Sequence, residues 1–316
     1  MKQKHKRLKM HSNSLLSINR NSFKFILILL LLKSINAVAF LKANDILALP
    51  YSRADIRIPY GDSPRQFGDL RLPQGKGPFP VVIVIHGGCW LSNMANLNFM
   101  APVAQALTKE GYATWNIEYR AADSKGGGWP GTFQDVGKAV DFLQTIAPKY
   151  HLDLNKVVII GHSAGGHLAL WAASRHKLPN DSLLYSGHIL PIKGVISLAG
   201  PGDLRNYMPW GEKVCKNENI ANMLVGNTKA LQDERFSQTS PAEMLPLGVK
   251  QIVIIGDNDL GVPAMLGEEY IAKALQKGDD ATFMLAKDSA HYEVVAPGSH
   301  AWPMVLISIN ALLKSN

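Results

Sequence analysis

A serine between two glycines is the feature of this sequence that most directly suggests chemistry. Ser163 lies in the hexapeptide 161–166, which reads Gly-His-Ser-Ala-Gly-Gly. The apolar run before it predicts a buried strand, and the run rich in Ala, Leu and Trp after it predicts a packed helix. A serine on such a strand-to-helix turn is typical of a nucleophile elbow, in which a tight turn exposes the hydroxyl above the sheet. We therefore expect Ser163 to act as a nucleophile.

A serine hydroxyl is a weak nucleophile until a base removes its proton, and the usual base is a histidine held by a carboxylate. In chains with this elbow, the acid and then the histidine follow the serine. Asp259 and His291 occur in that order, each just beyond a predicted strand, at 251–255 and 281–286. Because open α/β sheets place their sites at the carboxyl ends of the strands, we expect both residues to lie near Ser163.

Each of these two loops contains an alternative residue. Asp257 directly follows its strand, and we interpret it as a cap of the turn that presents Asp259. His300 follows Pro297 and Gly298 beside the last predicted helix, which favours a surface or capping role over that of the base. Three further histidines are interpreted as structural hydrogen-bonding residues: His86, His162 and His167. No histidine pair has H-E-x-x-H zinc-site spacing, and the expected chemistry requires no metal or organic cofactor.

A second element supplies donors for the negative charge that develops on an attacked carbonyl. Residues 86–90 read His-Gly-Gly-Cys-Trp and directly follow the β-branched run 81–85. Glycines in such a turn bring main-chain N–H groups close to the substrate. The candidate oxyanion donors are the amides of Gly88, Cys89 and Ala164, with that of Gly87 as the alternative. Trp90 either forms a wall of the substrate pocket or packs in the core.

A glycine-rich loop at 126–131 matches the G-x-G-x-x-G pattern of dinucleotide-binding proteins. The loop begins near Arg120 instead of directly after its strand, and Pro130 removes an amide donor. We therefore interpret it as a loop that borders the mouth of the site, with Trp129 facing the substrate or a lid.

The first 39 residues have the composition of an export signal. They contain eight Lys and Arg residues and no Asp or Glu, together with the apolar run 25–32 and Ala-Val-Ala at 37–39. An apolar run of eight residues is too short to span a bilayer. We expect a secretory signal peptide cleaved after about Ala39, and hence a periplasmic or secreted protein without a stable membrane span. An uncleaved membrane anchor is the alternative.

The net charge of +8 belongs to this leader. Without its eight cations, 25 of the 33 Lys and Arg residues remain, against 25 Asp and Glu residues. The basic excess therefore does not indicate nucleic-acid binding, and we expect a small-molecule substrate instead.

The 277 residues from 40 to 316 alternate strand and helix patterns, which predicts one α/β domain with a mostly parallel, doubly wound sheet. Strands are predicted at 54–59, 67–72, 81–85, 112–119, 157–160, 194–199, 251–255 and 281–286, and helices at 102–110, 133–147, 163–174, 268–276 and 302–313. Residues 201–248 interrupt this alternation, and we interpret them as a cap or lid; a surface insertion with its own small core is the alternative.

The two cysteines, Cys89 and Cys215, are an even pair in a chain with a predicted export signal. Such a pair is compatible with a disulfide, because oxidising compartments favour its formation. Two separate buried thiols are the alternative.

With these elements in order, the chain resembles the α/β-hydrolase superfamily across nearly the whole of residues 40–316. Within it, residues 86–90 are similar to the H-G-G-x-W signature of kynurenine formamidases and related bacterial feruloyl-esterase-like carboxylesterases, and 161–166 fit the same group. The resemblance implies a triad of Ser163, Asp259 and His291 that hydrolyses small esters or N-formyl amides. Kynurenine formamidase works in the cytosol, whereas this chain has a predicted export signal, so we expect an ester.

Two other functions use the same fold. An exopeptidase is one alternative, but such enzymes often gate peptides with an additional domain, for which 277 residues leave no room. A binding protein built on an inactive hydrolase is the other, and it would lack a member of the triad. Because all three residue types are present in the expected order, a serine esterase is the favoured interpretation.

Overall fold

The computed structural model describes residues 39–314, so the predicted signal peptide, apart from Ala39, lies outside the described residues. The chain separates into Met1–Ala39 and Phe40–Asn316, and the fold described below is that of the second unit. Its centre is one eight-stranded sheet with the order β1-β2-β4-β3-β5-β6-β7-β8. The strands are β1 (Ile56–Pro59), β2 (Phe67–Arg71), β3 (Phe79–Ile85), β4 (Ala113–Ile117), β5 (Leu152–His162), β6 (Gly194–Leu198), β7 (Lys250–Gly256) and β8 (Ala281–Ala286).

The sheet is mostly parallel, as the sequence predicts. β1 pairs with β2 and β2 with β4 in antiparallel fashion, and all pairings from β4 to β8 are parallel. Parallel strands bring their carboxyl ends to one edge, where the loops after β3, β5, β7 and β8 meet.

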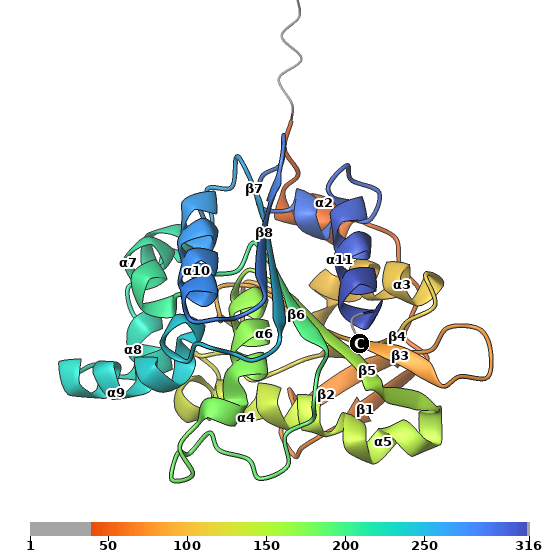
Figure 1. Cartoon of the computed structure of the whole chain (residues 1–316), viewed down its shortest axis with the longest axis horizontal. Helices are drawn as coiled ribbons and strands as arrows, with labels where there is room; N and C mark the ends of the chain where they lie inside the picture. The colour runs from red at the N-terminus through yellow and green to blue at the C-terminus, as the bar shows by residue number, and fades with distance from the viewer. Residues whose placement is uncertain (1–38, 315–316) are drawn as a thin grey trace, which may run out of the picture. The chain divides into compact units, whose positions relative to one another are not determined.

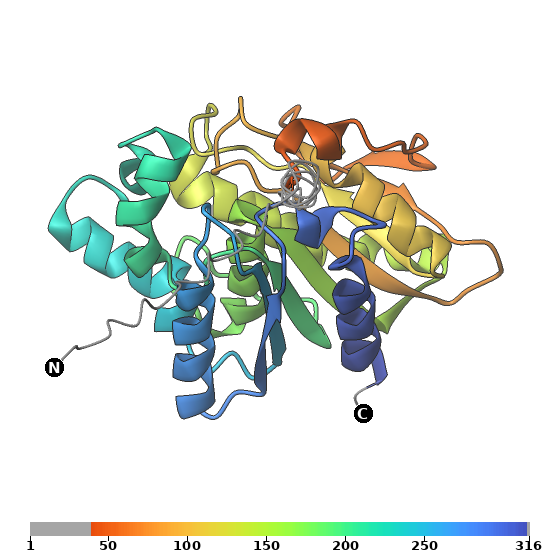
Figure 2. The same ribbon diagram turned by 90° about the horizontal axis from the view of Figure 1, so that it is seen from above.

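Helices cover both faces of the sheet (Figure 1). The α-helices are α2 (Ala43–Leu47), α3 (Ala101–Lys109), α4 (Gly128–Asp141), α5 (Leu143–Tyr150), α6 (Ala164–Ser174), α7 (Leu204–Cys215), α8 (Ile220–Val225), α9 (Lys229–Thr239), α10 (Ala264–Gln276) and α11 (Trp302–Lys314), and the 3-10 turns are η1 (Leu97–Met100), η2 (Arg175–Lys177), η3 (Pro241–Glu243) and η4 (Glu293–Val295). Figure 2 shows α3 and α11 on one side of the sheet and α6 and α10 on the other.

The central strand β3 shows why the sheet has two cores. All residues from Val81 to Ile85 are buried. Val82 and Val84 pack with residues of α3 and α11, whereas Val81, Ile83 and Ile85 pack with residues of α4, α6 and α10. Side chains alternate across a strand, so a continuous β-branched run satisfies both faces at once.

The predicted helix at 133–147 is two helices. α4 begins at Gly128, five residues earlier than predicted, and ends at Asp141, and α5 begins at Leu143. At the junction the amide of Thr145 donates to the carbonyl of Phe142, an i to i+3 contact that tightens the turn. Pro148 then lacks the N–H of a regular helix. The hydrophobic period continues through the break, which is why the sequence pattern did not reveal it.

The insertion at 201–248 is mainly helical and contains α7, α8 and α9. Its buried residues Leu204, Leu224 and Phe236 belong to the same apolar cluster as strand residues such as Ile83 and Val195. The insertion therefore extends the main core and has no small core of its own. Within residues 39–314, no helix is long and apolar enough to cross a bilayer.

Candidate active site

The elbow at Ser163 is a tight turn between β5 and α6. Ser163 has φ 54° and ψ −121°, a conformation that costs energy for a residue with a Cβ and is typical of functional turns. Its amide donates to the carbonyl of Leu198 at 2.8 Å. A Cβ on Gly161 would lie 2.0 Å from the carbonyl oxygen of Gly165, and one on Gly165 would lie 2.3 Å from that of Ile85. The two motif glycines are therefore required by close backbone contacts.

Asp259 and His291 form a hydrogen-bonded pair beyond β7 and β8. Asp259 Oδ2 lies 2.8 Å from His291 Nδ1, and the carboxylate is fully buried. Its Oδ1 also accepts the amides of Gly261 at 2.7 Å and Val262 at 2.9 Å. With three donors fixed around it, the carboxylate holds the ring with Nδ1 protonated, so Nε2 carries the free lone pair that a general base needs.

The two alternative residues support the loop of His291 instead. Asp257 is exposed, and its Oδ1 accepts the amide of Ser289 at 3.2 Å. His300 Nε2 lies 2.9 Å from Ser289 Oγ and 2.8 Å from the carbonyl oxygen of Lys287. Both residues therefore brace the segment between β8 and His291.

Ser163 and His291 line one cavity of about 500 Å³, a size typical of small-molecule sites. Gly88 and Cys89 of the H-G-G loop line it as well. Much of the remaining lining is apolar and includes Phe40, Leu41, Met94, Phe99, Val214 and Leu260. The structure thus brings the predicted nucleophile, the predicted base and two predicted donor residues to the same apolar cavity, with Asp259 behind the histidine.

The backbone of the H-G-G loop is compatible with an oxyanion site. Gly88 has φ +100° and Cys89 has φ 54°, so consecutive amides turn out of the extended strand direction. In the described chain, the amides of Gly88, Cys89 and Ala164 donate to no protein acceptor. The amide of Ala164 is also the first of α6, where the helix dipole favours negative charge. Gly87, the alternative, does not line the cavity and packs against the elbow, where a Cβ would lie 2.6 Å from the carbonyl of His162.

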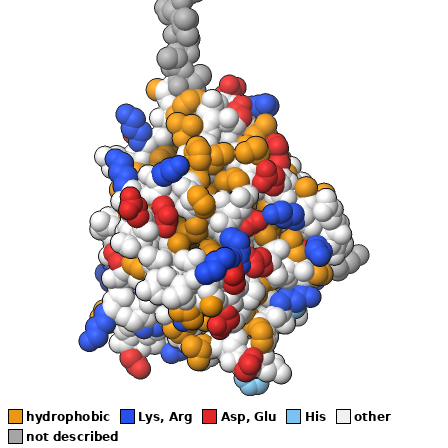
Figure 3. Space-filling model, turned by 90° about the vertical axis from the view of Figure 1, so that its left-hand side faces the viewer, with side chains coloured by type: hydrophobic (Ala, Val, Ile, Leu, Met, Phe, Trp, Pro, Cys, Tyr) orange, Lys and Arg blue, Asp and Glu red, His pale blue; other side chains and the backbone are white. Residues whose placement is uncertain are grey.

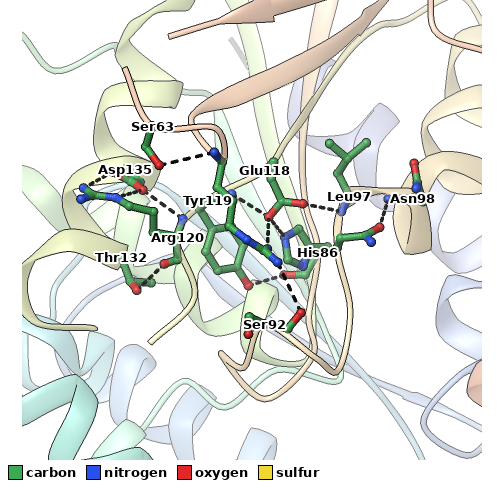
Figure 4. Close-up of polar contacts among 12 residues, drawn as sticks. Ser63, His86, Ser92, Leu97, Asn98, Glu118, Tyr119, Arg120, Thr132 and Asp135 are labelled. Carbon is green, nitrogen blue, oxygen red and sulfur yellow. Dashed lines mark hydrogen bonds and ion pairs between the residues drawn. The ribbon is translucent and has the colours of Figure 1, made fainter. Parts of the chain in front are cut away.

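A buried glutamate that sequence reasoning missed anchors this loop (Figure 4). Glu118 follows β4, and its Oε1 lies 3.0 Å from His86 Nε2, while its Oε2 accepts the amide of Leu97 at 3.1 Å. Burial alone raises the pKa of the Glu118 carboxyl, but the His86 ring and the backbone N–H groups of Tyr119 and Leu97 outweigh burial and lower it. Tyr119 completes the support, because its hydroxyl donates to the carbonyl of His86 at 2.9 Å. The available signal was an acid at the carboxyl end of a buried strand, the same criterion that selects Asp259.

The two histidines beside the elbow have structural partners. His162 Nε2 lies 2.9 Å from the carbonyl oxygen of His291, so the ring links the elbow to the loop of the predicted base. His167 Nε2 lies 2.8 Å from the carbonyl of Thr239, and its Nδ1 accepts the indole N–H of Trp90 at 3.2 Å. One ring nitrogen of each histidine faces a carbonyl, which fits the neutral tautomer protonated at Nε2.

His167 makes the stability of the fold sensitive to pH. Burial lowers the pKa of its ring from 6.5 to about 4. Between these values an unfolded chain binds a proton that the folded chain does not, so this contribution to stability is complete above pH 6.5 and is lost as the pH falls toward 4. We expect the free energy of unfolding to fall by about 3 kcal/mol over this range through His167. Urea unfolding of the wild type and of His167→Gln at pH 6.5 and pH 4 measures the effect. An equal change in the free energy of unfolding between the two pH values in both proteins would contradict it.

Neither Trp90 nor Trp129 lines the cavity of Ser163, so the second alternative given from the sequence applies to each: the core for Trp90 and the insertion 201–248 for Trp129. Trp90 is 1% exposed and packs in the core, where its indole donates to His167 and its ring lies edge-on to Tyr207. Trp129 is half-buried and stands 6.4 Å from the ring of Phe133, with the Arg235 guanidinium of α9 4.9 Å from its own ring centroid. Neither tryptophan lines the cavity of Ser163. The reason is that both rings found partners on distant segments, and Trp129 faces the insertion instead of the substrate.

The structure joins Cys89 and Cys215 in a disulfide. The bond connects the H-G-G loop to the last residue of α7, so the insertion is covalently attached to a candidate oxyanion loop. The alternative of two separate thiols does not apply to this structure.

The disulfide predicts a chemical and an energetic result. Neither cysteine should be alkylated in the unfolded protein without reductant, and both should be alkylated after reduction. A bond across 126 residues restricts the unfolded chain strongly, so the double variant Cys89→Ser, Cys215→Ser should unfold with about 2–4 kcal/mol less free energy. Mass spectrometry and urea unfolding test these two outcomes, and alkylation of both thiols in the unreduced protein would exclude the bond.

Within residues 39–314, no group of three or more His, Cys, Asp or Glu side chains is placed to hold a metal ion.

A depression of about 680 Å³ lies along α4 and α5, away from Ser163. Its buried arginine, Arg175, already forms a bidentate pair with Asp141 at 2.7 and 2.8 Å. The cavity of Ser163 is therefore the better candidate for substrate binding.

Comparison with known proteins gives one family and several distant relatives. A family model described as BD-FAE matches residues 69–273. Esterase LipC of Mycobacterium tuberculosis is 25% identical over 221 residues, which are 69% of this chain and 54% of LipC. A probable isoprenylcysteine alpha-carbonyl methylesterase ICME of Oryza sativa subsp. japonica is 24% identical over 250 residues, 77% of this chain and 59% of that protein. The chain thus spans somewhat more than half the length of these curated relatives.

Solved structures share the fold. Esterase B from Lactobacillus Rhamnosis superposes with a TM-score of 0.71 at 22% identity, covering 93% of this chain and 97% of that one. A truncated carbohydrate esterase from gut microbiota superposes with a TM-score of 0.68 at 22% identity, covering 84% of this chain and 98% of that one. At this level of identity the superpositions show a common α/β-hydrolase fold.

Proposed function

The chain belongs to the BD-FAE family, an esterase family of the α/β-hydrolase fold, and we propose that it is a serine carboxylesterase with a triad of Ser163, His291 and Asp259. One observation carries the proposal. His291, held by the buried carboxylate of Asp259, lines the same cavity as Ser163 on its strained elbow. The curated relatives LipC and ICME are named as esterases, which supports the same reaction class.

In the proposed reaction, His291 Nε2 accepts the proton of Ser163 as the hydroxyl oxygen attacks the ester carbonyl carbon. Asp259 stabilises the imidazolium that forms. The imidazolium then protonates the leaving alcohol, and an acyl-serine remains. Water repeats the sequence on this intermediate, with His291 again as the base, and releases the carboxylic acid.

The negative charge on the carbonyl oxygen is held by main-chain donors. The amides of Cys89 and Gly88 come from the H-G-G loop, and that of Ala164 comes from the first turn of α6. The two loop amides are fixed before the reaction, because Glu118 and the disulfide hold the H-G-G loop from two sides. Each such donor contributes about 10²–10³ in turnover.

We also propose that the domain acts outside the cytoplasm. The basic and apolar leader supports export. The joined cysteines support it independently, because disulfides persist in oxidising compartments.

The decisive experiment is a panel of p-nitrophenyl esters from acetate to octanoate, with N-formylkynurenine as an additional substrate. The formamide is included because 86–90 and 161–166 resemble kynurenine formamidase motifs. We expect ester hydrolysis and a fluorophosphonate adduct on Ser163. Preferred cleavage of the formamide would move the enzyme to the arylformamidases. Absence of both hydrolysis and the adduct would overturn the proposal in favour of a binding protein.

A further inference from the structure

A segment that precedes the sheet in the sequence forms one wall of the cavity of Ser163. Four consecutive residues, Phe40 to Ala43, line the same cavity as Ser163 and His291. The first three of these residues precede the short helix α2, and Ala43 is its first residue. In the sequence they lie about 250 residues before His291. None of them belongs to the triad or to the H-G-G loop, so the wall they form has no role in the reaction described above.

This segment is fastened to the domain. The amide of Leu41 donates to Glu293 Oε1 at 2.5 Å, and the amide of Lys42 donates to Asp45 Oδ2 at 2.7 Å. Ile46, one helical turn further, is completely buried in the apolar cluster that contains α3 and α11. The segment is thus held by a long-range hydrogen bond on one side and by core packing on the other.

Glu293 connects the segment to the catalytic histidine. The residue is 5% exposed, and its second oxygen, Oε2, accepts the amide of Ala290 at 2.8 Å. Ala290 directly precedes His291. One buried carboxylate therefore fixes both the wall formed by Phe40–Ala43 and the loop that presents the base.

The chemistry of the cavity indicates what the wall contacts. Its described lining contains no Asp, Glu or Arg, and Lys42 is the only ionisable group besides the tyrosines and the two histidines at the elbow and triad. Met94, Val214 and Leu260 line the cavity and are 53%, 39% and 80% exposed, so they form an apolar rim. Figure 3 shows apolar side chains gathered in the upper part of one face of the molecule. An uncharged apolar group fits such a lining, whereas a carboxylate or phosphate would find few partners.

We propose that Phe40–Ala43 is a substrate-selecting wall of the cavity and that it contacts the apolar part of an uncharged ester. Phe40 is the contact residue. Glu293 is a positioning residue that fixes the wall and the loop of the base relative to each other. This inference rests on the proposed esterase function and adds the group that the site selects.

The test compares kcat/KM for p-nitrophenyl hexanoate and acetate in the full chain. In Phe40→Ala the hexanoate-to-acetate ratio should fall about tenfold, because the longer chain loses an apolar contact that acetate does not reach. Leu47→Ala is the matched control, since Leu47 lies on α2 and is 53% exposed but does not line the cavity. This control should keep both the ratio and the acetate rate.

Glu293→Gln provides the second readout. This variant replaces one of the two carboxylate acceptors of Glu293. Like Phe40→Ala, it should lower the hexanoate-to-acetate ratio, and it should also lower kcat for acetate, because the loop of His291 loosens. In both variants, the rate of Ser163 labelling by a long alkyl fluorophosphonate should fall more than the rate of labelling by a short one. If the wild-type enzyme hydrolyses esters but Phe40→Ala keeps the wild-type hexanoate-to-acetate ratio, the proposal that Phe40–Ala43 selects the substrate is wrong. A wild-type protein that neither hydrolyses esters nor labels would instead overturn the esterase function.

Discussion

Replacement of Ser163 by Ala should lower kcat for p-nitrophenyl acetate by about 10⁴-fold or more, because no acyl-enzyme can form without the hydroxyl. The remaining rate should come from the oxyanion donors and binding alone. Ser163 is half-buried, and its side chain makes no hydrogen bond in the described chain, so its removal breaks no structural contact. Steady-state kinetics and thermal unfolding measure the two consequences separately, and the unfolding temperature should stay nearly unchanged.

A serine elsewhere on the surface gives the matched control. Ser237 is exposed on α9 and bonds only to the carbonyl of Glu234 in its own helix. Ser237→Ala should retain wild-type kcat. Retained turnover in Ser163→Ala, with no loss of fluorophosphonate labelling, would show that another residue is the nucleophile.

The exchange of Asp259 for Asn should lower kcat by about 10⁴-fold while the fold persists. The new amide oxygen can still accept the N–H groups of Gly261 and Val262, so its NH₂ group must face His291 Nδ1. Nδ1 then has to accept, and the proton moves to Nε2, which leaves the ring unable to take the proton of Ser163. Kinetics with p-nitrophenyl acetate measure the loss, and circular dichroism checks the fold.

Asp257→Asn is the control for this experiment, because the two acids are two residues apart in the same loop. Asp257 is exposed and contacts Ser289, so its neutralisation should change kcat only a few-fold. A larger loss of kcat in Asp257→Asn than in Asp259→Asn would show that Asp257, and not Asp259, is the acid of the triad.

Residues outside the proposed triad hold the loops that present it. Glu118 supports the H-G-G loop through His86, and His162 connects the elbow to the carbonyl of His291. The disulfide attaches Cys89 to α7, and Tyr207 of α7 donates its hydroxyl to the carbonyl of Gly261 beside Asp259. The insertion is therefore connected to both the candidate oxyanion loop and the loop of Asp259, as a structural part of the candidate site.

The sequence alone was sufficient where the physical signal is local. The apolar run 81–85 predicted a strand buried on both faces, and β3 is such a strand. The serine between two glycines predicted a tight strand-to-helix turn, and the close contacts of Gly161 and Gly165 show why that turn has no room for a Cβ. The loops after β7 and β8 were identified by their position at strand ends, because parallel pairing brings those ends to one edge whatever lies between them.

The tertiary structure decided everything that depends on pairs far apart in the chain. From the sequence, Trp90 could face the substrate or the core; it lies in the core, where His167, 77 residues away, accepts its indole N–H. Glu293 and Leu41 are separated by 252 residues and leave no periodicity from which their contact could be predicted. Local patterns record which face of an element is buried, whereas the partner that buries it is selected by three-dimensional packing. The candidate reacting groups could therefore be predicted along the chain, whereas the walls and supports around them could be identified only from the tertiary structure.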